Sequence, residues 1–425
     1  MIITRDLYLD RLKRKANNGL VKVVTGLRRS GKSFLLMTLF KNWLLETGVK
    51  SENILAIDLE SDDNRALRNP DELSAYFKTH IHEGQGRCYV LIDEVQMAIQ
   101  KSELKSDEPI RLYGILTDLI KRRNADVYVT GSNSKFLSSD IRTEFRGRSD
   151  EIRVYPLTFA EYFSSCRHQD KLQAWRDYST YGGLPYLASV DNEEDKRNYL
   201  SNLFSNIYFK DIVERFSLQG DEILSTMTDI LASNVGSLTN PTRLAKTFES
   251  KGIKTSDVTI SLDIERLIDS FLIQKAARYD VKGKKYIDSP FKYYFADIGL
   301  RNSRLRFRQQ EPTHIMENII YNELVARGYE VDVGIVRKES KDNEGKRELK
   351  NLEIDFVCNK GSERFYVQSA YSIPTVEKMN QETSSLNSVP DSFPKVIVTQ
   401  DNVAPYHTEK GYLVINVLDF LLGQK

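Results

Sequence analysis

The chain of 425 residues has 61 Lys plus Arg against 60 Asp plus Glu, which gives a formal net charge of +1. This near-cancellation excludes a strongly basic whole-protein nucleic-acid binder, although it is compatible with a local basic patch. The length predicts about two to four domains, and a composition with 40% hydrophobic and 28% charged residues is typical of a soluble globular protein.

The sequence contains no recognisable membrane or export signal. No run approaches the roughly 18 apolar residues of a spanning helix, and Arg5 and Asp6 are not followed by an apolar stretch. The three cysteines, Cys88, Cys166 and Cys358, lie far apart and have no metal-binding spacing. We therefore expect a reduced, cytoplasmic protein without a membrane partner.

The first 160 residues alternate between strand and helix patterns. Helical stretches are expected near 71–82 and 110–123. The expected strands are 20–25, 54–59, 88–92, 127–130 and 152–157. Strands separated by helices predict βαβ units, and therefore an α/β fold with a mainly parallel sheet.

A phosphate-binding sequence stands between the first strand and the helix that follows it. Residues 26–33 read GLRRSGKS and match GxxxxGK[ST] at every fixed position. Lys32 is expected to reach the β- and γ-phosphates, and the Ser33 hydroxyl to ligate Mg²⁺. The expected nucleotide contacts in this segment are Gly26, Leu27, Arg28, Arg29, Ser30, Gly31, Lys32, Ser33 and Phe34.

An acidic sequence at the end of a later strand supports the phosphate-binding assignment. Residues 88–94 read CYVLIDE, an apolar strand that ends in two acids. Asp93 is expected to hold Mg²⁺ through water, and Glu94 to orient and polarise the attacking water. A carboxylate in this second position indicates hydrolysis rather than nucleotide binding alone.

Further polar residues follow the later strands. Ser132 or Asn133 would contact the γ-phosphate or the attacking water, and a glycine turn with an Asx cap is an equally open interpretation. Arg146 or Arg148 would stabilise charge on the γ-phosphate, or lie on a solvated surface. No Asn-Lys-x-Asp guanine signature follows, so ATP is the expected nucleotide.

These motifs together resemble a family of prokaryotic AAA-type P-loop ATPases with a C-terminal domain of uncharacterised function. The resemblance rests on residues 24–33, 91–96, 130–133, 145–148, 155–162 and 182–185. It implies the roles given above for the phosphate loop and the acid pair. It also implies that Ser132 or Asn133 is a sensor and that Arg146 or Arg148 is an arginine finger. We assign residues 1–160 to the ATPase domain and 161–221 to a helical connector.

Residues 222–305 are predicted to form a winged helix-turn-helix. Three helical blocks (223–235, 242–251 and 256–271) precede two short strand-like pieces, 273–279 and 285–287. Cations in this region include Lys246, Lys251, Lys254, Arg266, Lys282, Lys284 and Lys285. They allow DNA contact, but acidic residues share the helices, and a packing lid is the open alternative.

Residues 306–425 resemble a degenerate PD-(D/E)xK nuclease. Glu317 and Asp355 fit its acidic positions, whereas Gln368 and Ala370 stand where an acid and a lysine belong. The resemblance therefore implies a nuclease-like fold that no longer cleaves. The polar stretch 337–350 is expected to be a solvated loop.

The sequence predicts an Mg²⁺-dependent ATPase that works as a conformational switch. Its expected partners are ATP, DNA through the winged helix, a protein through the C-terminal domain, and copies of itself. The alternative is a nucleotide-binding DNA or protein interaction module with negligible turnover. An ATP-gated nuclease is a third option, against which Gln368 and Ala370 argue.

Overall fold

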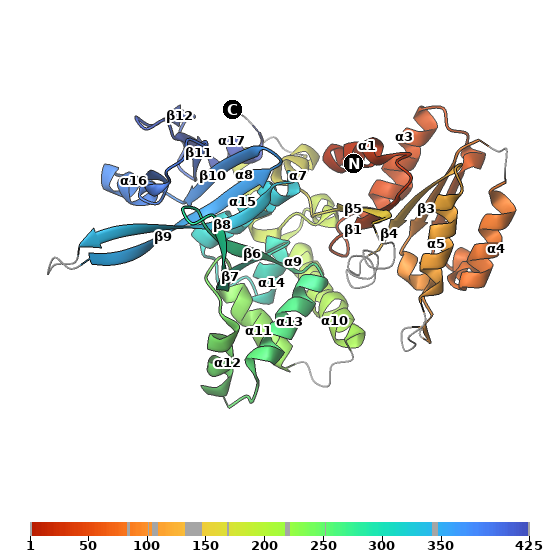
Figure 1. Cartoon of the computed structure of the whole chain (residues 1–425), viewed down its shortest axis with the longest axis horizontal. Helices are drawn as coiled ribbons and strands as arrows, with labels where there is room; N and C mark the ends of the chain where they lie inside the picture. The colour runs from red at the N-terminus through yellow and green to blue at the C-terminus, as the bar shows by residue number, and fades with distance from the viewer. Residues whose placement is uncertain are drawn as a thin grey trace. The chain divides into compact units, whose positions relative to one another are not determined.

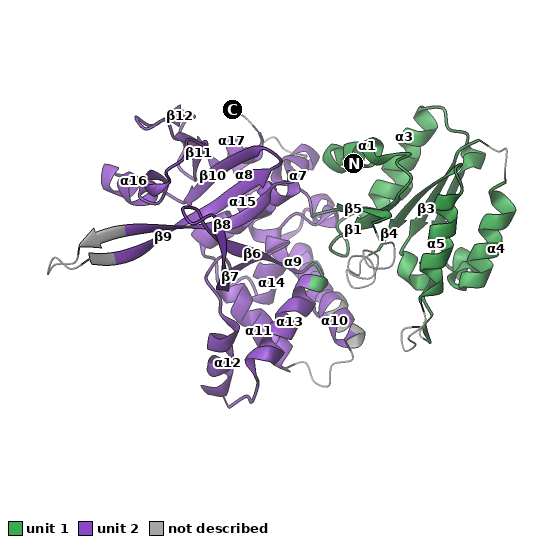
Figure 2. Cartoon of the chain, viewed as in Figure 1, with its two compact units in different colours: residues 1–155, 269–271 green, residues 156–268, 272–425 purple. Residues whose placement is uncertain are grey.

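The computed structural model describes residues 2–82, 86–100, 102–103, 109–131, 147–167, 170–216, 222–250, 252–341 and 347–423. The chain divides into two compact units, residues 1–155 with 269–271 and residues 156–268 with 272–425 (Figure 2). None of the helices in the described ranges is long and apolar enough to cross a membrane. The finer division into four domains stays a prediction.

The N-terminal unit is built on a five-stranded parallel sheet (Figure 1). The strand order is β2-β3-β4-β1-β5, and each neighbouring pair is parallel. The strands are β1 (Val21–Thr25), β2 (Ile54–Asp58), β3 (Cys88–Asp93), β4 (Ala125–Thr130) and β5 (Ser149–Arg153). All residues of β1, β3 and β4 are buried, as expected for strands covered on both faces. The α/β fold with a parallel sheet is confirmed.

The helices of this unit confirm the predicted alternation. They are α1 (Asp6–Lys15), α2 (Lys32–Phe34), a π-helical turn (Leu35–Phe40), α3 (Lys41–Glu46), α4 (Pro70–His80) and α5 (Arg111–Lys121). Apolar residues of α4 and α5, such as Phe77 and Leu116, pack against β3 and β4 in the core. The fifth strand was misplaced by the sequence pattern: β5 begins at Ser149, because Ser149 and Asp150 already pair with Val21 and Lys22.

The C-terminal unit contains an eight-stranded mixed sheet in the order β12-β13-β11-β10-β9-β8-β6-β7. Its strands are β6 (Ile273–Asp280), β7 (Lys285–Phe295), β8 (Glu330–Lys341), β9 (Arg347–Lys360), β10 (Glu363–Ala370), β11 (Lys395–Thr399), β12 (Tyr406–His407) and β13 (Leu413–Asn416). Its helices are α7 (Phe159–Ser165), α8 (Lys171–Tyr181), α9 (Glu193–Leu203), α10 (Lys210–Arg215), α11 (Glu222–Ser233), α12 (Pro241–Ser250), α13 (Asp257–Asp269), α14 (Ile298–Arg304), α15 (Pro312–Ala326), α16 (Val376–Thr383) and α17 (Val417–Leu421).

The predicted solvated loop at 337–350 is wrong. Strands β8 and β9 pair antiparallel out to Lys341 and Arg347, and they extend beyond the rest of the sheet as a two-stranded arm (Figure 1). The described side chains of this arm, at 337, 338, 349 and 350, are exposed, and Leu349 is 66% exposed. The alternation of apolar and polar residues that identifies a half-buried strand is therefore missing from the sequence.

The predicted hairpin after the three helices is present, and its second strand is longer than expected. Strand β7 runs to Phe295 and pairs antiparallel with β6. Strand β6 also pairs in parallel with β8, from Arg278 and Val333 to Asp280 and Ile335. The hairpin is thus part of the large sheet, and the winged-helix interpretation stays a prediction.

Candidate nucleotide site

The phosphate loop and the acid pair meet at one edge of the N-terminal sheet. Strands β1, β3 and β4 run in parallel, and each ends beside a candidate residue. Val24 pairs with Thr130, and Ile92 pairs with Val129. The register therefore brings the loop after β1, the acids after β3 and Thr130 at the end of β4 together. In open α/β sheets ligands bind at this carboxyl edge.

The loop takes a backbone path that its glycines allow. Gly26 has φ +133° and Gly31 has φ +93°, which lie in the region that side chains disfavour. A Cβ at Gly26 would lie 2.1 Å from the Val154 carbonyl oxygen, so no other residue fits there without moving the backbone. The next turn begins helix α2 at Lys32, and its N-terminus adds partial positive charge for a phosphate.

Lys32 is folded into the loop. Its Nζ donates to the carbonyl oxygens of Gly26 at 3.0 Å and Leu27 at 2.9 Å, and the residue is 4% exposed. Burial lowers the pKa of Lys32 to about 8, against the opposing effect of Glu94 and Asp93. The ammonium is therefore held by two uncharged carbonyl acceptors, which the charged oxygens of a phosphate can replace.

Asp93 is buried beneath the loop with hydroxyl partners. Thr130 Oγ1 donates to Asp93 Oδ1, and the Ser33 side chain is hydrogen-bonded to the same carboxyl group. Burial raises the pKa of Asp93, and these two hydrogen bonds counteract it. The Ser33 hydroxyl and the Asp93 carboxylate are the oxygen donors that Mg²⁺ prefers, so the residues present fit the predicted ion.

Glu94 has a left-handed backbone, and both its N–H and its carboxylate are hydrogen-bonded. Its backbone is left-handed, at φ 50° and ψ 49°, which is uncommon for a residue other than glycine. Its N–H donates to Thr130 Oγ1 at 3.0 Å, and Gln96 Nε2 donates to Glu94 Oε2. Thr130 thus bridges both acids. The sequence pattern had ended a strand there without assigning it a role.

A second residue that the sequence did not indicate is Arg5. This side chain is 3% exposed and donates to the carbonyl oxygens of Ser30 at 3.1 Å and Tyr155 at 2.6 Å. The Tyr155 N–H in turn donates to Tyr8 Oη at 3.2 Å. Arg5 therefore ties the phosphate loop to the segment after β5. A single arginine in a polar N-terminal stretch carries no signal for this role.

The remaining predicted residues differ in their exposure. Leu27 and Ser30 are buried, whereas Arg29, Ser33 and Phe34 are exposed. Arg28 is partly buried, with Nη2 3.8 Å from Glu60 Oε1. The side chain of Arg148, just before β5, is exposed. Ser132, Asn133 and Arg146 lie outside the described residues, so their roles stay predictions.

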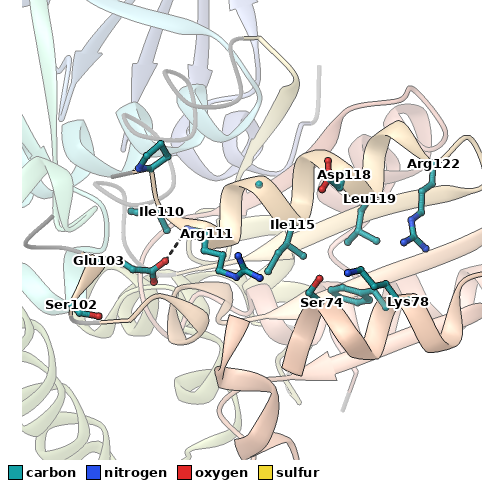
Figure 3. Close-up of a pocket in the computed structure, with 13 residues that line it drawn as sticks. Ser74, Lys78, Ser102, Glu103, Ile110, Arg111, Ile115, Asp118, Leu119 and Arg122 are labelled. Atoms are coloured by element: carbon teal, nitrogen blue, oxygen red, sulfur yellow. Dashed lines mark hydrogen bonds between the residues drawn. The ribbon is translucent and has the colours of Figure 1, made fainter. Parts of the chain in front are cut away.

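A separate hollow of about 740 Å³ lies between α4 and α5 (Figure 3). Cationic and acidic side chains both line it, among them Lys78, Arg111 and Glu103. One oxygen of Glu103 accepts the Arg111 backbone N–H at 2.9 Å. None of its lining residues belongs to the phosphate loop or the acid pair, so this hollow does not enlarge the nucleotide site.

Comparisons with known families agree with the site. Residues 18–163 match the family described as an AAA domain, and residues 172–311 match a domain of unknown function (DUF8612). An uncharacterized protein of Haemophilus influenzae is 34% identical over 427 residues, covering 99% of each chain. An uncharacterized protein of Methanocaldococcus jannaschii is 23% identical over 395 residues, covering 89% of this chain and 79% of that one.

The solved structures that the comparison matched include two proteins described with DNA. The Aeropyrum pernix ORC1 protein in complex with DNA is 10% identical, with a TM-score of 0.31 over 72% of this chain and 93% of that chain. The replication initiator DnaA bound to AMPPCP and single-stranded DNA is 11% identical, with a TM-score of 0.32 over 61% and 86%.

Proposed function

This chain belongs to the protein family of its Haemophilus influenzae relative and has an AAA domain, and from that premise we propose that it binds and hydrolyses ATP with Mg²⁺. The observation that supports this most directly is the meeting of Lys32, Asp93 and Glu94 at one edge of the parallel sheet. A loop that only turned the chain would not need a buried lysine whose charge is favoured by two nearby acids.

The residues divide the chemistry between them. Lys32 exchanges its two carbonyl partners for the β- and γ-phosphates, and the loop N–H groups hold the other phosphate oxygens. Ser33 and Asp93 would hold Mg²⁺, which would supply positive charge to neutralise the phosphates. Glu94 orients the attacking water and accepts its proton, while Gln96 steadies the carboxylate by its hydrogen bond.

The first experiment measures phosphate release from ATP with Mg²⁺ for the wild type and for Glu94→Gln. We expect the variant to lose about a hundredfold or more in kcat, because general-base catalysis contributes on this scale, while its ATP affinity is retained. Glu60→Gln is the matched control, because Glu60 is an exposed carboxylate near Arg28. Tight ATP binding with turnover that ignores Glu94 would instead support the non-hydrolysing interaction module.

The same assay addresses the partners that we propose. Turnover that rises with duplex DNA supports action on DNA through residues 222–305, and turnover indifferent to DNA supports a protein partner at the C-terminal unit. If Arg146 or Arg148 acts across a subunit interface, the activity per subunit should rise with protein concentration. Activity that stays constant while mass measurements show assembly would rule out that arrangement.

A further inference from the structure

Three carboxylates in the C-terminal unit surround one lysine, and we call them the acid cluster: Glu317 of α15 and Glu353 and Asp355 of β9. Lys292 of β7 places its Nζ 2.9 Å from Glu317 Oε1, 2.7 Å from Glu353 Oε1 and 4.0 Å from Asp355 Oδ1. The nuclease-like resemblance calls for a lysine at position 370, where the chain has alanine. A lysine from a distant strand supplies the positive charge instead.

The cluster is closed on several sides. Tyr294 Oη donates to Glu317 Oε1 at 2.6 Å, and the Ser369 N–H donates to Asp355 Oδ2 at 2.8 Å. The turn after α11 approaches so closely that a Cβ at Gly236 would lie 3.1 Å from Glu317 Oε1. Glu317 is 6% exposed and Asp355 is 8% exposed, whereas the side chain of Glu353 is 33% exposed, so two of the three carboxylates are shielded from solvent.

The charge balance favours the ammonium. Burial by itself lowers the pKa of Lys292, but the acid cluster outweighs burial and holds this pKa above its usual value. Burial and the nearby Glu317 raise the pKa of Asp355 well above the ordinary value for a carboxyl group. A divalent ion would need these same oxygens at about 2.0–2.2 Å, where it would meet the ammonium at close range and be repelled.

We propose that Lys292 is the resident cation of the acid cluster, in the place where a metal-dependent nuclease holds a divalent ion. Lys292 and the acid cluster then join β7, α15 and β9 structurally. They hold no metal and cleave no nucleic acid. A divalent ion and the ammonium are mutually exclusive here, so removal of the lysine should create a metal site.

The test measures Mn²⁺ binding by titration calorimetry without nucleotide, in an Asp93→Asn background that removes the other metal site. We expect no saturable Mn²⁺ binding by the protein with Lys292 intact. Lys292→Met should bind Mn²⁺ at one site at least about tenfold more tightly than the protein with Lys292 intact, and the melting temperature of this variant should rise with Mn²⁺. Lys196→Met is the matched control, because buried Lys196 pairs with the single carboxylate of Asp177, at 3.1 Å, among the described ion pairs.

Two results would overturn the proposal. One is Mn²⁺ binding by the protein with Lys292 intact that disappears in Asp355→Asn, because metal and lysine would then coexist. The other is a folded Lys292→Met protein that gains no more Mn²⁺ affinity than Lys196→Met. If the methionine variant does not fold, Lys292→Gln is measured in its place. If neither variant folds, the measurement on the protein with Lys292 intact decides. ATP turnover is no part of the readout, so the result is independent of the proposed ATPase activity.

Discussion

Lys32 illustrates how a single residue is held ready for a ligand. In the structure its ammonium has two carbonyl partners and almost no contact with water, so its charged form is disfavoured by burial. Nucleotide phosphates would reverse this balance by supplying negative charge at hydrogen-bonding distance. The protonation of Lys32 and the binding of ATP are therefore linked.

The linkage predicts proton uptake on binding. With a pKa of about 8 in the free protein, Lys32 is half deprotonated at pH 8, and phosphate contact restores its proton. We expect about half a proton to be taken up per nucleotide at pH 8, and about a tenth at pH 7. Titration calorimetry in two buffers with different ionisation enthalpies measures this number.

Above pH 8 the same linkage lowers ATP affinity by about tenfold per pH unit. Equal binding heats in the two buffers at pH 8 would mean that Lys32 stays charged without nucleotide, and would contradict the prediction. The pH 7 titration is the internal control, because the protein, the nucleotide and the buffers are unchanged while the expected uptake falls.

At the scale of elements, the site depends on how the loop after β1 packs against the segment after β5. Gly26 lies directly under the Val154 carbonyl, and the Val154 N–H donates to the Thr25 carbonyl oxygen at 2.8 Å. Arg5 adds a second connection from Ser30 to Tyr155. These contacts therefore join the strand, the loop and the segment after β5 to one another.

This packing predicts a strong effect of Gly26→Ala. The added Cβ meets a backbone oxygen that cannot rotate away, so we expect nucleotide affinity to fall about tenfold or more and the N-terminal unit to lose stability. Gly48→Ala is the matched control, because Gly48 also has a positive φ, +89°, but nothing lies within 4 Å of its Cβ position.

The control should cost only about 1–2 kcal/mol of backbone strain and leave nucleotide affinity unchanged. Fluorescent-nucleotide binding and thermal unfolding of both variants separate the two effects. Wild-type affinity in Gly26→Ala would show that the loop does not need its contact with Val154.

At the scale of the molecule, a buried carboxyl group links distant segments of the C-terminal unit. Asp297 is 2% exposed and accepts the Gly183 N–H at 2.7 Å and the Leu300 N–H at 3.1 Å. A Cβ at Gly182 would lie 2.2 Å from Asp297 Oδ1. The Gly182-Gly183 turn is thus a close packing contact between α8 and α14.

Asp297 predicts a pH dependence of stability for this unit. Burial raises its pKa from 3.8 to about 6 in the folded protein, with the backbone hydrogen bonds opposing the shift. Because the folded state holds the proton more tightly, the stabilisation is complete below about pH 4 and is lost as the pH rises through 6. The expected loss is about 3 kcal/mol between these limits.

Urea unfolding of the wild type and Asp297→Asn across this range measures the effect. Trp175 of α8 reports on the C-terminal unit once Trp43, the other tryptophan, is replaced by phenylalanine in both proteins. The asparagine variant starts less stable but lacks this titration, so its stability should fall less as the pH rises. Parallel curves for the two proteins would contradict the assignment to Asp297.

Much of the fold follows from local patterns, and so do the phosphate loop and the acid pair of the site. The parallel sheet, the phosphate loop and the acids at 93 and 94 are encoded in short stretches, because strand burial and phosphate contact each need particular residues at fixed spacing. Alternating apolar and polar residues identify a strand only when one of its faces is buried. In the β8–β9 arm the described side chains at 337, 338, 349 and 350 are exposed, so residues 337–350 have the polar composition that predicts a loop.

Only the tertiary structure decided which distant side chains meet. Arg5 reaches the phosphate loop from 25 residues away. Lys292 of strand β7 lies 25 residues before its partner Glu317 of helix α15. Thr130 gained its role because parallel pairing set it beside Asp93. The sequence by itself determined the chemistry of the loop and the acid pair. The partners of buried charges depend on strand order and register, which form only when the chain packs, and no local spacing encodes them.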